Sequence, residues 1–171
     1  TNGDYMITAG GAVTQSGALT VAGTTDIDAD GFAVYDVTLN TLGNDFGGAV
    51  SITGKDVSLF DSNDIDFGAS MTTGTFNVLA GGDITQSGAL NIAGDSSLAG
   101  VNITLNNASN DFIGTVSASG SLLGGNVSLT DINAINLGTS NTNGDYMITA
   151  GGAVTQSGAL SVTGMTMISA I

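Results

Sequence analysis

A stretch of nineteen residues occurs twice in this chain without a single change, and this limits the folds that the chain can adopt. Residues 142–160 are identical to residues 1–19. A third, weaker copy at residues 80–90 matches residues 9–19 at an offset of 71. A fixed period of this kind is the signature of repeat architectures, in which each unit stacks on its neighbours.

The period divides the chain into units of about 70 residues. The unit occurs twice and begins a third time. We therefore expect one continuous repeat segment over residues 1–171, cut from a longer array, with successive units at 1–70, 71–141 and 142–171, the last of them partial.

The composition favours short strands joined by tight turns. The 171 residues include 27 Gly, and the fifteen acidic residues are all Asp, while Glu, Arg, Pro, Cys, Trp and His are absent and Lys55 is the one basic residue. Good helix formers are therefore scarce, whereas β-branched residues and the turn formers Gly, Asn and Asp are abundant. A hydrophobic fraction of 42% argues against a disordered acidic tail.

Charge excludes several classes of partner. The formal net charge is -14, so a nucleic-acid backbone or an anionic membrane surface would meet one cation and fifteen anions. No apolar stretch is long enough to cross a membrane. We expect no nucleic-acid partner and no direct membrane insertion, and a chain without thiols is compatible with an extracellular location.

Short runs of alternating apolar and polar residues predict the strands. Taking one central apolar position of each run as equivalent gives steps of 30, 20, 21, 25, 24 and 21 along the chain. These steps predict six coils in the long repeat that separates the two identical stretches. The central positions are Ile7, Val37, Val57, Val78, Ile103, Val127 and Ile148.

Each strand is too short to be stable alone, and half of its side chains need a second layer to cover them. Stacked coils supply that layer at a spacing of about 4.8 Å. The sequence therefore predicts an all-β fold: a right-handed parallel β-helix, or β-solenoid, with about three short strands per coil of about 20–30 residues and roughly seven coils. A β-sandwich is the alternative, but its strands occupy non-equivalent places and would not return to identical sequence.

Three phrases carry a family resemblance: Gly-Gly-Ala-Val-Thr-Gln-Ser-Gly-Ala-Leu (10–19), Asn-Asp-Phe-Gly-Gly-Ala-Val-Ser-Ile-Thr-Gly (44–54) and Asp-Val-Ser-Leu-Phe-Asp (56–61). With these phrases the chain resembles the repeats of filamentous-haemagglutinin-like exoproteins and related giant bacterial surface proteins. The resemblance implies a secreted, very long right-handed β-helix shaft that serves adhesion, biofilm or surface fibres. An Arg-Gly-Asp motif is impossible without Arg, and no binding residue is carried over.

Catalysis has few residues to use. Without His and Cys, and with a single Lys, nucleophilic triads and cationic clamps cannot be built. Paired carboxylates can cleave polysaccharides, and two groups of Asp could supply them. Their alternation with apolar residues places them instead on a solvated face, so we expect no catalytic residue and no enzyme. The two groups are Asp26, Asp28, Asp30 and Asp61, Asp64, Asp66.

A row of carboxylates is the candidate metal site. The coil alignment places four Asp residues in the same turn of four consecutive coils, where like charges about 5 Å apart would repel. Calcium accepts carboxylate oxygens in a flexible geometry and could relieve this repulsion. The sequence predicts no other cofactor. The four residues are Asp45, Asp64, Asp83 and Asp111.

These observations predict a mechanical function. We expect a structural shaft of a secreted or cell-surface bacterial fibre, extracellular and associated with itself end to end within a longer filament. The alternative is an adhesin module that binds a cell-surface glycan or host receptor through the loop at 24–35, where Phe32 and Tyr35 interrupt the repeat. A polysaccharide-degrading enzyme is the third hypothesis.

Overall fold

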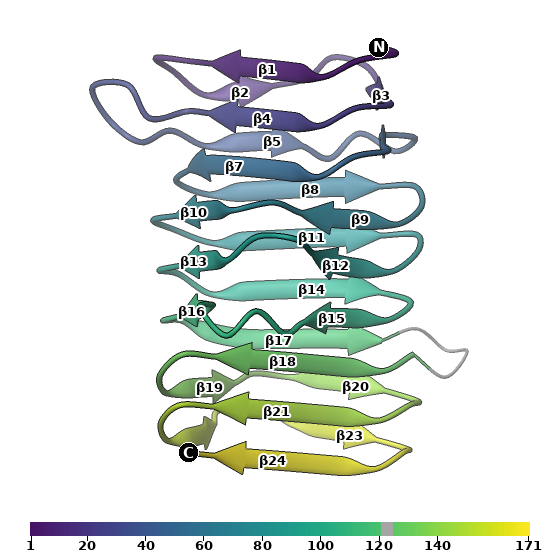
Figure 1. Cartoon of the computed structure of the whole chain (residues 1–171), viewed down its shortest axis with the longest axis vertical. Helices are drawn as coiled ribbons and strands as arrows, with labels where there is room; N and C mark the ends of the chain where they lie inside the picture. The colour runs from purple at the N-terminus through teal and green to yellow at the C-terminus, as the bar shows by residue number, and fades with distance from the viewer. Residues whose placement is uncertain (121–124) are drawn as a thin grey trace.

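Alternating side chains give each strand one buried and one outward face. In β8 (Val57–Asp61) and β11 (Phe76–Ala80), every second residue is buried. The computed structural model describes residues 1–120 and 125–171, and these form strands, turns and connecting segments without a helix, so no helix there could span a membrane. The strands stack in a column with the two chain ends at its opposite ends (Figure 1).

Two large parallel sheets form the opposite sides of the column. The twelve-stranded sheet contains β1 (Tyr5–Thr8), β4 (Thr25–Asp28), β7 (Val50–Gly54), β9 (Ile65–Phe67), β10 (Ser70–Thr72), β12 (Ile84–Gln86), β13 (Leu90–Ile92), β15 (Ile103–Leu105), β16 (Asp111–Phe112), β18 (Val127–Asp131), β21 (Tyr146–Ala150) and β24 (Thr166–Ala170). The ten-stranded sheet contains β2 (Val13–Thr14), β5 (Val37–Leu39), β8, β11, β14 (Ser96–Gly100), β17 (Thr115–Gly120), β19 (Ile135–Leu137), β20 (Ser140–Thr142), β22 (Val154–Gln156) and β23 (Leu160–Val162). A two-stranded sheet pairs β3 (Thr20–Val21) with β6 (Asp45–Phe46).

The winding is right-handed. In Figure 1 the strands of the twelve-stranded sheet lie in front and run to the left, those of the ten-stranded sheet lie behind and run to the right, and the chain descends from its N-terminus. Register partners on successive coils are unequally spaced along the chain, from the close pair Val50 and Phe67 to the more distant pair Thr25 and Val50. The fold is therefore the predicted parallel β-solenoid, with about eight coils.

Most coils contain one longer strand on one side of the column and two short strands on the other. The coil from β11 continues through β12 and β13 before β14 begins directly beneath β11, with Phe76 opposite Ser96. Three strands per coil agrees with the prediction. The circuit from Phe76 to Ser96 is shorter than most of the predicted steps.

The predicted equivalence of the strands was wrong in one respect. Val37, Val57 and Val78 lie in the ten-stranded sheet, whereas the other four central residues lie in the twelve-stranded sheet. Seven successive pairings link β1 to β21, so the long repeat contains seven coils and not six. The error arose because both sheets bury the same alternating apolar pattern, so the pattern alone does not distinguish them.

One repeat unit therefore contains three and a half coils. Strands β1, β11 and β21 occupy equivalent places in three successive units, and they lie in the twelve-, ten- and twelve-stranded sheets in turn. The extra half coil falls where two longer strands follow each other, at β7 and β8 and again at β17 and β18. Equivalent stretches of successive units consequently lie on opposite sides of the column.

The core is a column of stacked apolar side chains between the sheets. Phe67 and Phe76 are fully buried and meet edge to face, with ring centroids 5.1 Å apart. Burying one such side chain stabilises the fold by about 1.5–3 kcal/mol. The column continues through Ile84, Ile103 and Val127, which follow one another in register.

Close approach of successive turns explains why many turns contain glycine. A Cβ on Gly81 would lie 2.2 Å from the carbonyl oxygen of Ser62, and one on Gly88 would lie 2.1 Å from the backbone nitrogen of Ala69. Positive φ is restricted to Gly43 in the described part of the chain. Crowding between coils, and not left-handed backbone, is therefore the main reason for these glycines. The sequence has another Gly-Gly pair at Gly124 and Gly125, of which Gly124 lies outside the described residues.

Candidate functional site

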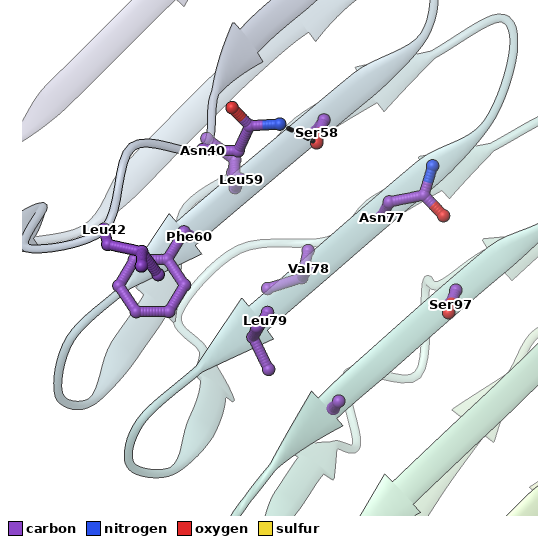
Figure 2. Close-up of a pocket in the computed structure, with 10 residues that line it drawn as sticks. Asn40, Leu42, Ser58, Leu59, Phe60, Asn77, Val78, Leu79 and Ser97 are labelled. Atoms are coloured by element: carbon purple, nitrogen blue, oxygen red, sulfur yellow. Dashed lines mark hydrogen bonds between the residues drawn. The ribbon is translucent and has the colours of Figure 1, made fainter.

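The outer surface of the ten-stranded sheet carries a shallow groove over β8, β11 and β14 (Figure 2). Asn40, Ser58, Asn77 and Ser97 line one side, and the Asn40 Nδ2 donates a hydrogen bond to the Ser58 Oγ at 3.0 Å. The other side is apolar and consists of Leu42, Phe60, Leu79 and Ala99.

The groove suits binding and offers no catalytic group. Its lining has amide and hydroxyl groups that form hydrogen bonds, together with apolar side chains, but no carboxylate, amine or imidazole. Leu42 and Leu79 are 75% and 49% exposed, so they would lose contact with water if a partner covered them. A partner with an uncharged surface would cover this groove without burying a charged group that lacks a counter-charge.

The four predicted metal ligands do not form one row. Asp64 and Asp83 lie in successive turns, and the Asp83 backbone N–H donates to the Asp64 Oδ1 at 2.7 Å. Asp45 lies in β6 and Asp111 in β16, where each accepts a hydrogen bond from the Nδ2 of an Asn in the next coil. The expected alignment failed because it rested on the wrong equivalence of the strands.

Asp64 and Asp83 belong to a longer row that we term the Asx row: Asp64, Asp83, Asn102, Asn126 and Asp145. Each member precedes a strand of the twelve-stranded sheet, and each Oδ1 accepts the backbone N–H of the equivalent residue one coil later, at 2.7–3.0 Å. Two members are neutral amides, which limits the repulsion between carboxylates. No group of three or more acids among the described residues could hold a metal ion.

The Asp residues of the two groups considered for catalysis differ in their environments. Asp61 is fully buried, Asp64 lies in the turn that follows, and Asp66 faces outward, where its Oδ1 accepts a hydrogen bond from the Thr85 Oγ1 at 3.2 Å. Asp26 is exposed and Asp28 half-buried on the outer face of β4. The expectation of a solvated face was therefore wrong for Asp61 alone.

Asp61 and its equivalent Asp131 are buried carboxylates that sequence reasoning missed. Each Oδ2 accepts a backbone N–H from the neighbouring coil, Phe46 for Asp61 and Phe112 for Asp131, at 3.0 and 2.8 Å. Each Oδ1 accepts the N–H two residues later in its own turn. The alternation of residues in β8 indicates this burial, because Val57 and Leu59 point inward and the next inward position is Asp61.

Burial raises the pKa of both carboxyls. Desolvation is the main cause, the backbone N–H donors oppose it, and Asp45 and Asp64 raise the pKa of Asp61 further. Asp111 has the same effect on the pKa of Asp131. Each of these carboxylates ends a strand and binds the preceding coil, so its role is structural.

A buried amide network accompanies them. The Asn110 Oδ1 accepts hydrogen bonds from the Leu90 N–H and the Gln86 Nε2, and its Nδ2 donates to the Leu105 carbonyl and the Gln86 Oε1. Asn44 makes the equivalent set of hydrogen bonds one unit earlier. The amides therefore connect neighbouring coils through the core.

One loop projects from the column. The expected insertion at 24–35 begins with β4, so the irregular part is the segment 29–36 between β4 and β5, which Figure 1 shows extending beyond the other turns. The Tyr35 N–H donates to the Ala29 carbonyl at 3.0 Å, and Asp30 pairs with Val34, so the segment forms a small hairpin. Phe32 is fully exposed at its tip.

Comparison with known proteins gives one result. A family model described as "Repeats of unknown function (DUF5649)" matches residues 1–53, 54–119 and 124–171. The boundaries between these matches fall near the two places where one longer strand follows another. No curated protein matches the chain, and no solved structure matches it.

Proposed function

We propose, for a chain that belongs to the DUF5649 family of repeats of unknown function, that it forms part of a stiff, non-catalytic shaft in an extracellular fibre. The observation that carries this proposal is the uninterrupted stack of about eight coils with one continuous apolar core. In such a solenoid each coil contacts only its neighbours, so added units lengthen the shaft without disturbing the rest.

The hydrogen bonds support a mechanical role. Parallel pairing directs backbone hydrogen bonds along the long axis of the column, and the Asx row adds side-chain acceptors in the same direction. A second set of such bonds lies before strands of the ten-stranded sheet, where Asp56 and Asp95 accept the N–H groups of Thr75 and Thr115 at 2.8 Å. Bending the column would strain many of these bonds together.

The finer proposal follows the resemblance to filamentous-haemagglutinin-like repeats. We place the shaft on a bacterial surface or in a secreted fibre, where it associates with itself end to end within a longer filament or chain. The composition supports this setting, since one Lys and no Arg leave a single site for trypsin-like proteases.

Cryo-electron microscopy of the native source material tests the shaft. We expect thin filaments with a layer spacing of about 4.8 Å and an axial repeat of about 34 Å for seven coils, with a half-turn relation at about 17 Å. Compact particles would contradict the proposal. Antibody labelling of intact cells, with and without surface proteolysis, tests the location.

Binding through the projecting hairpin is a second candidate, and exposed Phe32 favours it. A glycan or a host receptor with an apolar pocket would be the partner. Comparison of the chain with Phe32→Ser on a glycan array and on host cells tests this function, because the variant alters the tip and leaves the column intact. Equal binding by both would exclude the hairpin.

A further inference from the structure

The ten-stranded sheet has an outer face without charge. Its strands contain one acid, Asp61, whose side chain is buried. The remaining surface acids lie in turns, in β6 at the margin, or on the outer face of the twelve-stranded sheet, where they are Asp26, Asp28, Asp66 and Asp111. On a chain with a net charge of -14, one broad side is therefore neutral.

Two rows of outward side chains run along this side. Register pairs Ser58, Asn77, Ser97 and Ser117 in one row and Phe60, Leu79, Ala99 and Ser119 in the next. We call these eight residues the neutral face. The first row can donate and accept hydrogen bonds, and the second is mostly apolar and forms one wall of the groove (Figure 2).

The internal repeat provides a comparison for this face. Because the unit contains three and a half coils, the positions equivalent to the second row lie on the twelve-stranded sheet. There Thr130 stands for Phe60, Thr149 for Leu79, and Asp28 or Ser169 for Ala99. The core residues of these strands keep their apolar character in both places. The apolar row therefore belongs to one side of the column and is not a property of the unit.

We propose that the neutral face binds a second copy of this chain, with the two ten-stranded sheets packed face to face. Packed sheets lie about 10 Å apart, and their side chains interdigitate. The whole ten-stranded sheet has eight levels of strands, and the neutral face occupies four of them, β8, β11, β14 and β17. With a width of about five residues, the whole sheet measures about 38 by 17 Å. The pair would bury roughly 1,200 Å² in total, which is at the lower end of stable interfaces.

Charge favours this arrangement over the others. Contact through the turns or the twelve-stranded sheet would bring carboxylates of two acidic chains together, and such contacts repel. The neutral face is the side on which two copies meet with their acids farthest apart. The remaining repulsion is long-range, so salt should strengthen the pairing, which is the reverse of its effect on a cationic partner.

Sedimentation equilibrium of the 171-residue chain tests the proposal, with the double variant Phe60→Thr, Leu79→Thr. Both substitutions introduce the residue found at the equivalent position of the other unit, so the fold is expected to persist, and far-ultraviolet circular dichroism checks it. The control is Met147→Thr, which removes an exposed apolar side chain from the other sheet. We expect a dimer that strengthens with NaCl, weakened about tenfold or more by the double variant and unaffected by the control.

A crosslinking measurement separates this dimer from association at the ends of the column. The chain has no Cys, so Asn77→Cys and Met147→Cys each place one thiol on one side. A short bismaleimide should join two copies at position 77 and not at 147. A monomer at every salt concentration, an equal loss with the control, or a dimer that the double variant leaves unchanged would each overturn the proposal.

Discussion

Replacement of Asn110 by Ala tests whether buried amides hold the coils together. Asn110 is fully buried, and its side chain contacts three segments: Leu90 one coil earlier, Leu105 in its own coil and Thr130 one coil later. An Ala at this position offers no polar atom to any of them. The change therefore removes a connection between coils without altering the turn sequence around it.

The expected cost follows from the groups left without partners. The Leu90 N–H and the Leu105 carbonyl lose hydrogen bonds of 2.9 and 3.1 Å. Gln86 and Thr130 also lose their bonds to Asn110, but both are half-buried and can reach water. A buried polar group without a partner costs about 1–3 kcal/mol, so the two together cost about 2–6 kcal/mol. The control is Asn106→Ala, which removes one hydrogen bond from an exposed side chain and should change stability by about 0.5 kcal/mol or less.

Urea denaturation compares the two variants, and hydrogen exchange locates the effect. We expect a lower midpoint for Asn110→Ala and faster exchange of the Leu90 amide, because that amide has lost its acceptor. Equal midpoints for the two variants would refute the reasoning. So would an unchanged exchange rate at Leu90, since it would mean that backbone pairing alone protects this coil.

Three further outcomes are expected. Gly88→Ala should lower the melting temperature by the equivalent of about 2 kcal/mol or more, because its Cβ would clash with the turn of the preceding coil. Gly17→Ala, at the equivalent position but in open space, should have little effect. Similar losses in both variants would exclude steric crowding as the cause. Lowering the pH from neutral towards the ordinary Asp pKa of 3.8 should raise the melting temperature, because the pKa values of Asp61 and Asp131 are raised in the folded chain. The stability that their protonated forms contribute is lost as the pH rises through the raised values. Substitution of both by Ala should flatten this dependence, and a wild-type melting temperature that falls over the same range would contradict it. Calcium should raise the melting temperature no more than magnesium at equal ionic strength, because the Asx row already has hydrogen-bond donors and neutral members. A calcium-specific rise that a chelator reverses would instead support the calcium hypothesis.

Much of the architecture could be predicted from the sequence because periodicity and alternation are local. The identical stretches at 1–19 and 142–160 required a repeat array, and the alternating runs required thin, two-faced strands. Parallel stacking followed, since only neighbouring coils could cover those strands. The exposed Phe32 loop was also readable, because it interrupts the period.

The candidate surfaces were harder to predict, since they depend on which residues share a side. The buried position of Asp61 was present in the alternation of β8, but the polar side chain suggested solvent. The row expected for calcium does not form, because Asp64 and Asp83 occupy the same turn on successive coils whereas Asp45 and Asp111 lie within β6 and β16. The neutral face had no signal in the sequence, because it is assembled from four strands of one sheet.

By itself the sequence determined the repeat, the strands and their inward residues, since each of these follows from side chains a few positions apart. Only the tertiary structure decided how many coils a unit contains. One coil runs from Phe76 to its register partner Ser96 on the next level. One unit contains three and a half such coils, so each unit ends on the side of the column opposite to the side on which it began. The extra half coil depends on turn geometry and on the register between coils. It places equivalent residues of successive units on opposite sides of the column.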